Sequence, residues 1–280
     1  RDSSNVTHHL TLVTHCDAGR LYKVQSLLQY WKGPMSIAML VPSNESVFVL
    51  NELDIMLKER SNVAVHFVIN DDPTGLFYPT NMMRNIAVNG SSTKYVFLCD
   101  VDFVPVTDAD VLLSKYTDTL PSKQVLVVPA LESKSTQVDD NALHSKTSLM
   151  KQVNVKIVQQ FHQDVCFQCH GATNLTKWWK ADTTYEVQYT NMFEPYVVMN
   201  KSEIISFKEY FVGRIYNKIS FFYALNHYGY KFSVVPDVYV IHFAQWITAG
   251  ANRQHKILLP KLLLILLDIS KQSQNKIICG

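Results

Sequence analysis

The stretch Lys94-Tyr-Val-Phe-Leu-Cys-Asp-Val-Asp-Phe-Val-Pro105 decides the fold. An apolar, β-favouring run over residues 95–99 stops at two carboxylates, Asp100 and Asp102, as expected for a buried strand with a polar tip. Carboxylates two residues apart at a strand end can point the same way, and hard cations such as Mg²⁺ or Mn²⁺ prefer oxygen ligands. A metal held there can bridge a diphosphate leaving group. The alternative is an ordinary Asp-rich turn.

Upstream of this stretch, strand patterns alternate with helix patterns. Because β-α-β-α-β-α-β order is typical of a parallel sheet covered by helices, an α/β fold is predicted. Ligands bind such sheets beyond the carboxyl ends of the strands, where a polar turn at residues 15–19 also lies. Two separate stretches therefore converge on one crevice, which favours a metal–nucleotide site over a solvated turn. The predicted strands are 10–14, 35–41, 63–69 and 95–99, and the predicted helices are 20–31, 45–60 and 81–89.

The second half of the chain is less regular. Residues 231–241 predict one strong strand that ends on His242. Two carboxylates and a distant imidazole, all at strand ends, would make a Mn²⁺ site with room for phosphate oxygens. The other predicted features are a strand at 125–129, a polar surface excursion at 131–165 with helix near 143–158, a strand at 194–199 and a helix at 218–227.

Composition excludes one broad class of function. The 280 residues include 26 basic and 24 acidic side chains, so no bulk charge would drive nucleic-acid binding. The chain begins at Arg1 without an initiator Met, and we expect any signal or anchor to lie outside it. The apolar run at 257–267 is too short to span a bilayer and is predicted to be a C-terminal packing helix.

The cysteines and sequons bear on the compartment. Cys166 and Cys169 have the spacing of a redox or zinc half-site, but no second half is evident, which leaves a local disulfide or two thiols. Five Asn-x-Ser/Thr sequons favour a secretory compartment without deciding it. They begin at Asn5, Asn44, Asn89, Asn174 and Asn200.

A series of motifs between about residues 10 and 242 resembles one family in content and order. The motifs are Tyr78-Pro-Thr-Asn-Met-Met-Arg-Asn-Ile-Ala87, Tyr95 to Pro105, His170-Gly-Ala-Thr-Asn174, Trp178, Thr184-Tyr-Glu-Val-Gln188, Phe193-Glu-Pro-Tyr-Val-Val198, Phe211-Val-Gly213, Asn217-Lys218, and Tyr230-Lys-Phe-Ser-Val-Val-Pro236 to Ile241-His242. Together they resemble the LARGE-type glycosyltransferases, glycosyltransferase family 49.

The resemblance implies a GT-A-type fold, a mostly parallel Rossmann-like sheet with helices on both faces. It implies a single domain over residues 8–245, with a donor half at 8–130 and an acceptor half at 160–245, followed by a C-terminal helical extension at 246–280. Members of the family are Golgi-lumenal type II membrane enzymes, so the anchor would lie outside this chain, and a homodimer stays open. They transfer a sugar from a UDP-sugar, with inversion and with Mn²⁺, to a glycan acceptor on a glycoprotein.

The known members are β-glucuronyltransferases that build on xylose in the O-mannosyl glycan of dystroglycan, so the resemblance implies glucuronic acid as the sugar. On the donor side it implies a metal site of Asp100, Asp102 and His242, with Asp102 the direct carboxylate ligand. The residues implied to bind the donor are Thr14, Asn81, Arg84 and Asn85 together with the two aspartates, and the Arg84 fork suits a phosphate or a sugar carboxylate.

On the acceptor side, inversion requires a base that takes the hydroxyl proton. Glu194 is the candidate, because it precedes an apolar strand where partial desolvation would raise its pKa. Its alternative role is to orient acceptor hydroxyls or to pair with a basic residue. The resemblance places His170, Asn174 and Trp178 in the acceptor wall, where an aromatic face can stack on a sugar ring. Trp178 can equally be a core residue.

Two departures from the family pattern leave other functions open. The segments are Gly213-Arg-Ile-Tyr216, where the family has a further glycine, and Phe243-Ala-Gln-Trp246, where it has a polar turn. They motivate a catalytically inactive relative that binds a glycan or a partner. A third hypothesis is an active transferase with UDP-xylose or UDP-N-acetylglucosamine as donor, because donor selectivity depends on a few sugar contacts.

Overall fold

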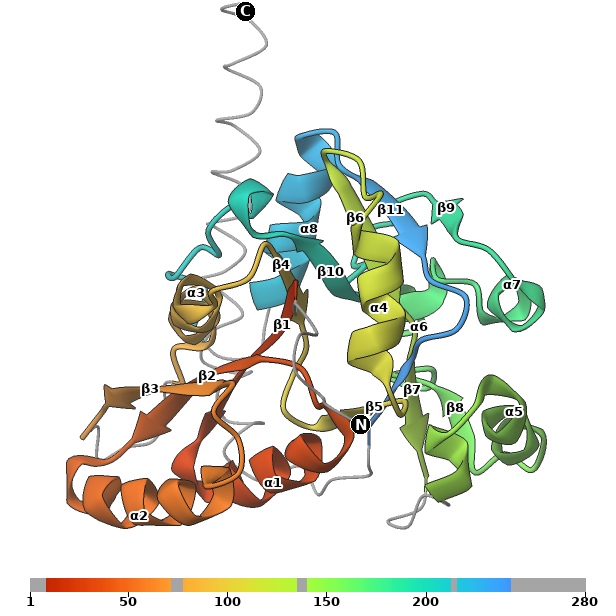
Figure 1. Ribbon diagram of the computed structural model, residues 1–280. Coiled ribbons are helices and arrows are strands. Elements are labelled where there is room, and N and C mark those ends of the chain that lie inside the picture. Colours follow the sequence, from red (N-terminus) through yellow and green to blue (C-terminus); the bar gives the residue numbers. More distant parts are fainter. Residues whose placement is uncertain (1–8, 72–77, 135–139, 213–215, 243–280) are drawn as a thin grey trace, which may run out of the picture.

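The computed structural model describes residues 9–71, 78–134, 140–212 and 216–242. The helical extension expected at 246–280 and most of both departures from the family pattern lie outside these ranges. Within them the strands form two sheets (Figure 1), and the chain passes from the first sheet to the second just after β4 (Tyr95–Leu98). No helix in the described ranges is long and apolar enough to cross a bilayer.

The larger sheet contains the predicted parallel unit. Four strands pair in parallel in the order β3-β2-β1-β4, which confirms the alternation expected from the sequence. Its helices lie on both faces, because Leu12 and Ile37 belong to the core under α1, whereas Val13 and Ala38 pack against Met83 of α3. The elements are β1 (Leu10–Asp17), α1 (Leu21–Tyr30), β2 (Met35–Val41), α2 (Ser46–Leu57), β3 (Val63–Ile69), α3 (Thr80–Gly90) and β4 (Tyr95–Leu98).

The same sheet continues with strands from the second half. Strand β10 (Tyr196–Asn200) runs antiparallel between β4 and β6 (Gln124–Val128), so the eight-stranded sheet is mixed. This insertion brings the residues just before Tyr196 to the end of β4. The sheet is completed by β11 (Lys231–Val234) and β9 (Tyr185–Val187).

The prediction of one strand over 231–241 is wrong. The chain leaves β11 at Val234, passes Pro236, and forms a separate strand, β12 (Val240–His242), in a second sheet. Proline has no backbone N–H for a ladder, and Asp237 accepts a hydrogen bond from Tyr116 at 2.8 Å, which holds the chain outside both sheets. The second sheet has the order β5 (Phe103–Pro105), β12, β7 (Ala130–Ser133) and β8 (Val158–Gln160).

The polar excursion expected at 131–165 is ordered in its described part. It contains β7, the helix α5 and β8, so it is part of the fold and not only a solvated loop. The Cys166–Cys169 pair forms a disulfide, which decides between the two alternatives left by the sequence. The remaining helices are α4 (Ala109–Thr117), α5 (Lys146–Asn154), α6 (Phe167–Gly171), α7 (Leu175–Lys180), α8 (Asn217–His227) and the 3₁₀ turns Ala18–Arg20, Ser43–Glu45, Asp140–Leu143 and Lys201–Glu203.

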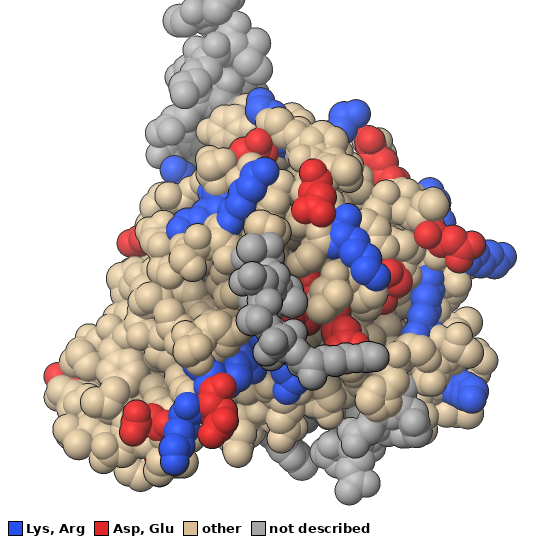
Figure 2. Space-filling model, viewed as in Figure 1, with Lys and Arg blue, Asp and Glu red and all other residues tan. Residues whose placement is uncertain are grey.

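Charge is distributed evenly over the described surface seen in Figure 2, where basic and acidic side chains are interspersed. This agrees with a net charge of +2 for the whole chain. The described face therefore carries no basic stripe of the kind that follows a nucleic-acid backbone.

Candidate active site

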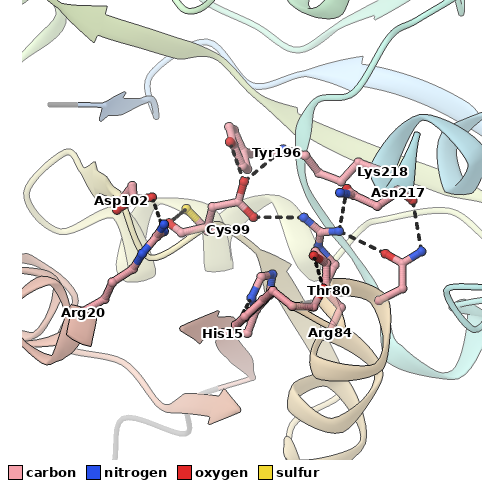
Figure 3. Close-up of polar contacts among 12 residues, drawn as sticks. His15, Arg20, Thr80, Arg84, Cys99, Asp102, Tyr196, Asn217 and Lys218 are labelled. Carbon is pink, nitrogen blue, oxygen red and sulfur yellow. Dashed lines mark hydrogen bonds and ion pairs between the residues drawn. The ribbon is translucent and has the colours of Figure 1, made fainter. Parts of the chain in front are cut away.

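Asp100 stands at the carboxyl end of β4 and is the centre of an ion-pair network. Its Oδ1 lies 3.3 Å from Nη2 of Arg84, and its Oδ2 lies 3.2 Å from Nζ of Lys218. Tyr196 donates its hydroxyl to Oδ2 at 2.9 Å. The three partners reach this point from α3, α8 and β10 (Figure 3). Segments far apart in the sequence thus meet at the predicted Asp-x-Asp tip.

The charges around Asp100 decide its protonation state. Burial by itself raises the pKa of this carboxyl, but Lys218 and Arg84 outweigh burial and hold the pKa well below its usual range. Asp100 is therefore ionised at neutral pH, and its charge is shared by two cations. Lys218 also lies over the face of Tyr196, with Nζ 4.0 Å from the ring centroid.

Asp102 pairs with a different cation. It is 8% exposed, and its Oδ2 accepts a hydrogen bond from Nη1 of Arg20 at 2.9 Å (Figure 3). Arg20 belongs to the turn after β1 and also contacts Asp17 at 3.5 Å. The ends of β1 and β4 therefore converge on one crevice, as the sequence analysis predicts.

The third predicted metal ligand, His242, lies on the strand beside the Asp-x-Asp tip. In the β5–β12 pair it is opposite Phe103, the residue that follows Asp102. Two carboxylates and an imidazole suit a divalent cation such as Mn²⁺ in donor chemistry. The structure does not bring the three sets of ligand atoms together, however. Among the described residues, the group of three metal-binding side chains gathered within 4.8 Å is a different one, and the two aspartates contact cations instead.

The donor-side residues on α3 divide into two roles. Arg84 donates to Oδ1 of Asn217 at 2.8 Å and to Oδ1 of Asn81 at 3.1 Å, so Asn81 helps to orient the guanidinium. Asn85 instead accepts from the backbone N–H of Phe207 and donates to Glu209. Asn81 is fully buried, and neither asparagine lines the cavity at the end of β4. In this structure both asparagines hold neighbouring segments in place, whereas Arg84 faces the cavity.

A cavity of about 20 Å³ beside Asp100 contains buried polar atoms. Thr14 and His15 line it together with Arg84 and Lys218. Oγ1 of Thr14 and Nε2 of His15 are buried without a hydrogen-bond partner in the described structure. Burial and the Arg84 charge lower the pKa of His15 to about 3, so its ring is neutral at neutral pH. Buried polar atoms without partners are uncommon in proteins and mark places where a ligand or water binds.

Glu194 lies just before β10. Its backbone N–H donates to the carbonyl of Cys169 at 2.9 Å. Burial raises the pKa of Glu194, as expected from the sequence, with Asp100 acting in the same direction and Lys218 and Arg84 opposing it. His170 lies close to Glu194 and is 2% exposed, and burial lowers the pKa of His170 well below its usual range.

Two predicted acceptor residues have structural roles. Trp178 is fully buried and donates its indole N–H to the carbonyl of Val235 at 2.9 Å. A ring without an exposed face cannot stack on a sugar, so the assignment of Trp178 to the acceptor wall is wrong. Asn174 is the N-cap of α7, and its side chain accepts from the backbone N–H of Lys177 at 3.0 Å.

Several residues of the site were not among the site residues predicted from the sequence. They are His15, Arg20, His162, Tyr196 and Lys218. The sequence did indicate Lys218, because this residue belongs to the Asn217-Lys218 motif that is part of the family resemblance. Arg20 follows the polar turn after the first strand, but nothing local indicates that it reaches Asp102, which is 82 positions away.

A parallel α/β unit with a paired-aspartate tip, cations around that tip and an adjoining cavity is the arrangement of a GT-A-type fold. The fold agrees with a solved structure, GalNAc-T7 with UDP, GalNAc and Mn²⁺, at a TM-score of 0.51 and 11% identity, covering 91% of this chain and 48% of that one. The chain belongs to glycosyltransferase family 49, whose model, described as "Glycosyl-transferase for dystroglycan", matches residues 9–75 and 70–256.

Curated relatives support the same assignment. The chain is 33% identical over 238 residues to the xylosyl- and glucuronyltransferase LARGE2s of Danio rerio, covering 83% of this chain and 31% of that protein. It is 31% identical over 263 residues to LARGE1 of Mus musculus, covering 90% and 34% respectively. The glycosyltransferase-like protein gnt14 of Dictyostelium discoideum is 28% identical over 240 residues, covering 84% of this chain and 37% of that protein. The chain spans about a third of the length of these relatives.

Proposed function

We propose that this domain is an inverting, Mn²⁺-dependent transferase that moves glucuronic acid from a UDP-sugar to a xylose-ended glycan on a glycoprotein. The observation that carries the proposal is the convergence of Arg84 and Lys218 on Asp100 beside a cavity with unpartnered polar atoms. The names of the curated relatives, xylosyl- and glucuronyltransferases, supply the sugar class.

The donor is held by residues of the first half and by α8. Thr14 and His15 provide the hydroxyl and the neutral imidazole for hydrogen bonds to the nucleoside. Arg84 and Lys218 contact the diphosphate, because guanidinium and ammonium groups are the usual protein partners of phosphate oxygens. Asn217 keeps Arg84 in position through its 2.8 Å hydrogen bond.

Asp100, Asp102 and His242 would hold the divalent cation. When bound, that cation offsets the negative charge of the diphosphate as it leaves. The fit rests on the donor set and on the pairing of His242 with the residue next to Asp102. Arg20, which donates to Asp102, lies where it can balance the charge of the same carboxylate.

Glu194 acts on the acceptor. Its carboxylate takes the proton of the acceptor hydroxyl while the oxygen forms the new bond to the anomeric carbon, and the UDP leaves from the opposite face. A base with a raised pKa is well matched to this step, because proton transfer is most efficient when the pKa lies near the working pH. His170 is held next to this carboxylate.

The compartment proposed is the Golgi lumen. The Cys166–Cys169 disulfide supports an oxidising environment, since such bonds are rare in reducing compartments.

The test is titration of UDP with and without Mn²⁺, followed by a UDP-release assay across UDP-glucuronic acid, UDP-xylose and UDP-N-acetylglucosamine with a xylose-terminated acceptor. We expect Mn²⁺-dependent UDP binding, and turnover with UDP-glucuronic acid. Turnover with another donor would change the sugar and leave the reaction class intact. UDP binding that is absent or independent of the metal would overturn the proposal and favour an inactive glycan-binding relative.

A further inference from the structure

A second cluster of metal-binding side chains lies on the acceptor side of the site. It consists of His162, His170 and Glu194, whose ligand atoms all lie within 4.8 Å of one another. No residue of this cluster belongs to the Asp100–Asp102–His242 set. We propose that these three side chains form a separate transition-metal site that prefers Zn²⁺.

The chemistry of the cluster points to zinc. Two imidazoles and one carboxylate form a His₂Glu set, which is a common zinc ligand set and leaves the fourth tetrahedral position open. Mg²⁺ prefers sites made only of oxygen atoms, so it suits this cluster less well. Zinc bonds of about 2.0–2.1 Å place tetrahedral ligand atoms about 3.4 Å apart. Atoms already within 4.8 Å can reach that separation by small side-chain rotations.

An independent observation comes from His170. This side chain is 2% exposed, and its Nε2 is buried with no hydrogen-bond partner in the described structure. A buried polar atom in that state costs free energy unless something binds it. A metal ion in the cluster would satisfy the nitrogen.

The backbone holds the three residues in one local frame. His162 adopts a left-handed conformation, with φ of 58°, that is uncommon for a side chain other than glycine. Its carbonyl accepts from the N–H of Cys166 at 2.8 Å, and Cys166 is joined by the disulfide to Cys169. The carbonyl of Cys169 in turn accepts from the N–H of Glu194. The disulfide and these two hydrogen bonds therefore connect all three ligand residues.

The aromatic surroundings restrict the imidazoles further. The ring of Phe161 stacks on His162 with centroids 3.8 Å apart and meets His170 edge-on at 5.2 Å. The positive charge of Lys218 acts on both His170 and Glu194. Its ion pair with Asp100 offsets that charge, so Lys218 repels a divalent ion in the cluster less strongly.

A metal ion bound to this cluster would also affect sugar transfer, an expectation that rests on the proposed function. A metal bound to Glu194 would lower the basicity of its carboxylate toward the acceptor proton, so Zn²⁺ would inhibit the reaction while leaving UDP binding unchanged.

The experiment is calorimetric titration of Zn²⁺ into the untagged chain in excess Mg²⁺, repeated with Co²⁺ and read by visible absorption. We expect one equivalent of Zn²⁺ in the wild type and in His227→Gln, an exposed histidine that serves as the matched control. His162→Gln and Glu194→Gln should each weaken binding by at least about 100-fold, with unchanged thermal unfolding in the absence of metal. Equal affinity in these two variants and the wild type would overturn the proposal.

Asp102→Asn separates this site from the Asp-x-Asp site. We expect it to keep the Zn²⁺ equivalent and the Co²⁺ spectrum, because Asp102 belongs to the other set. Loss of Zn²⁺ in Asp102→Asn with retention in His162→Gln would assign the ion to the aspartates and refute the inference. Either result leaves the UDP-release assay as an independent test of the proposed function.

Discussion

Replacement of Asp100 by asparagine tests the ion-pair network directly. The variant removes the carboxylate charge that Arg84 and Lys218 share, and their side chains are only 10% and 12% exposed. Breaking a buried ion pair typically costs about 3–5 kcal/mol, because the partner charge stays buried. Asp100 is itself 30% exposed, and Arg84 keeps its bond to Asn217, so we expect a loss of about 3 kcal/mol at the low end of that range.

The assay is urea and thermal unfolding followed by circular dichroism at neutral pH. For a domain of this size, a loss of about 3 kcal/mol corresponds to a Tm lower by about 6–12 °C. Asp54→Asn changes an exposed carboxylate on α2 in the same way and should have almost no effect. A loss below about 1 kcal/mol, or one equal to that of the control, would show that the network does not stabilise the fold.

The same variant has a defined pH dependence. The pKa of Asp100 is lower in the folded state than in the unfolded chain, so its stabilisation is complete above the ordinary carboxyl pKa of about 3.9. It is lost as the pH falls through the folded value. The difference in unfolding free energy between wild type and Asp100→Asn should therefore be constant from pH 5 to 7 and shrink below about pH 4. A difference that shrinks already between pH 7 and 5 would contradict the assignment.

The remaining predictions concern catalysis and the core. Asp102→Asn should lower the transfer rate by about 100-fold or more. Because its partner Arg20 is 38% exposed, the unfolding free energy should change by only about 1 kcal/mol. An unchanged turnover would remove the metal hypothesis. Glu194→Gln should lower kcat by about 10²- to 10⁴-fold with UDP affinity preserved, and should abolish the fall in rate that the wild type shows as the pH drops through its raised pKa. Lost UDP binding would instead place Glu194 on the donor side. Trp178→Phe loses the bond to Val235 and leaves space in the core, and it should cost about 2–3 kcal/mol without changing the KM for the acceptor, whereas a raised KM would return Trp178 to the acceptor wall.

Local patterns predicted the strands and helices around Asp100. The alternation of strands and helices, and the position of Asp100 at the end of β4, follow from periodicity and from the abrupt change of polarity after residue 99. The raised pKa of Glu194 also followed from its place before an apolar strand. These are properties of neighbouring residues, so one sequence is enough to predict them.

Partners far along the chain were not predictable in this way. The run from Lys231 to Ile241 looked continuous, but its two ends pair with different sheets. Trp178 has the same local sequence whether its ring is buried or exposed, and only the packing around Val235 decides that it is buried. His242 lies opposite Phe103, the residue after Asp102, and its role as a metal ligand stays a prediction.

The sequence by itself determined which residues form strands and helices, and which carboxylates stand at a strand end, because short-range sterics and burial set those choices. Only the tertiary structure decided that Lys218 reaches Asp100 across 118 positions and that His162 meets Glu194. Such contacts depend on where the strands β10 and β12 pair among the earlier strands. That order is set by the free energy of the whole folded chain and not by the preference of any one segment.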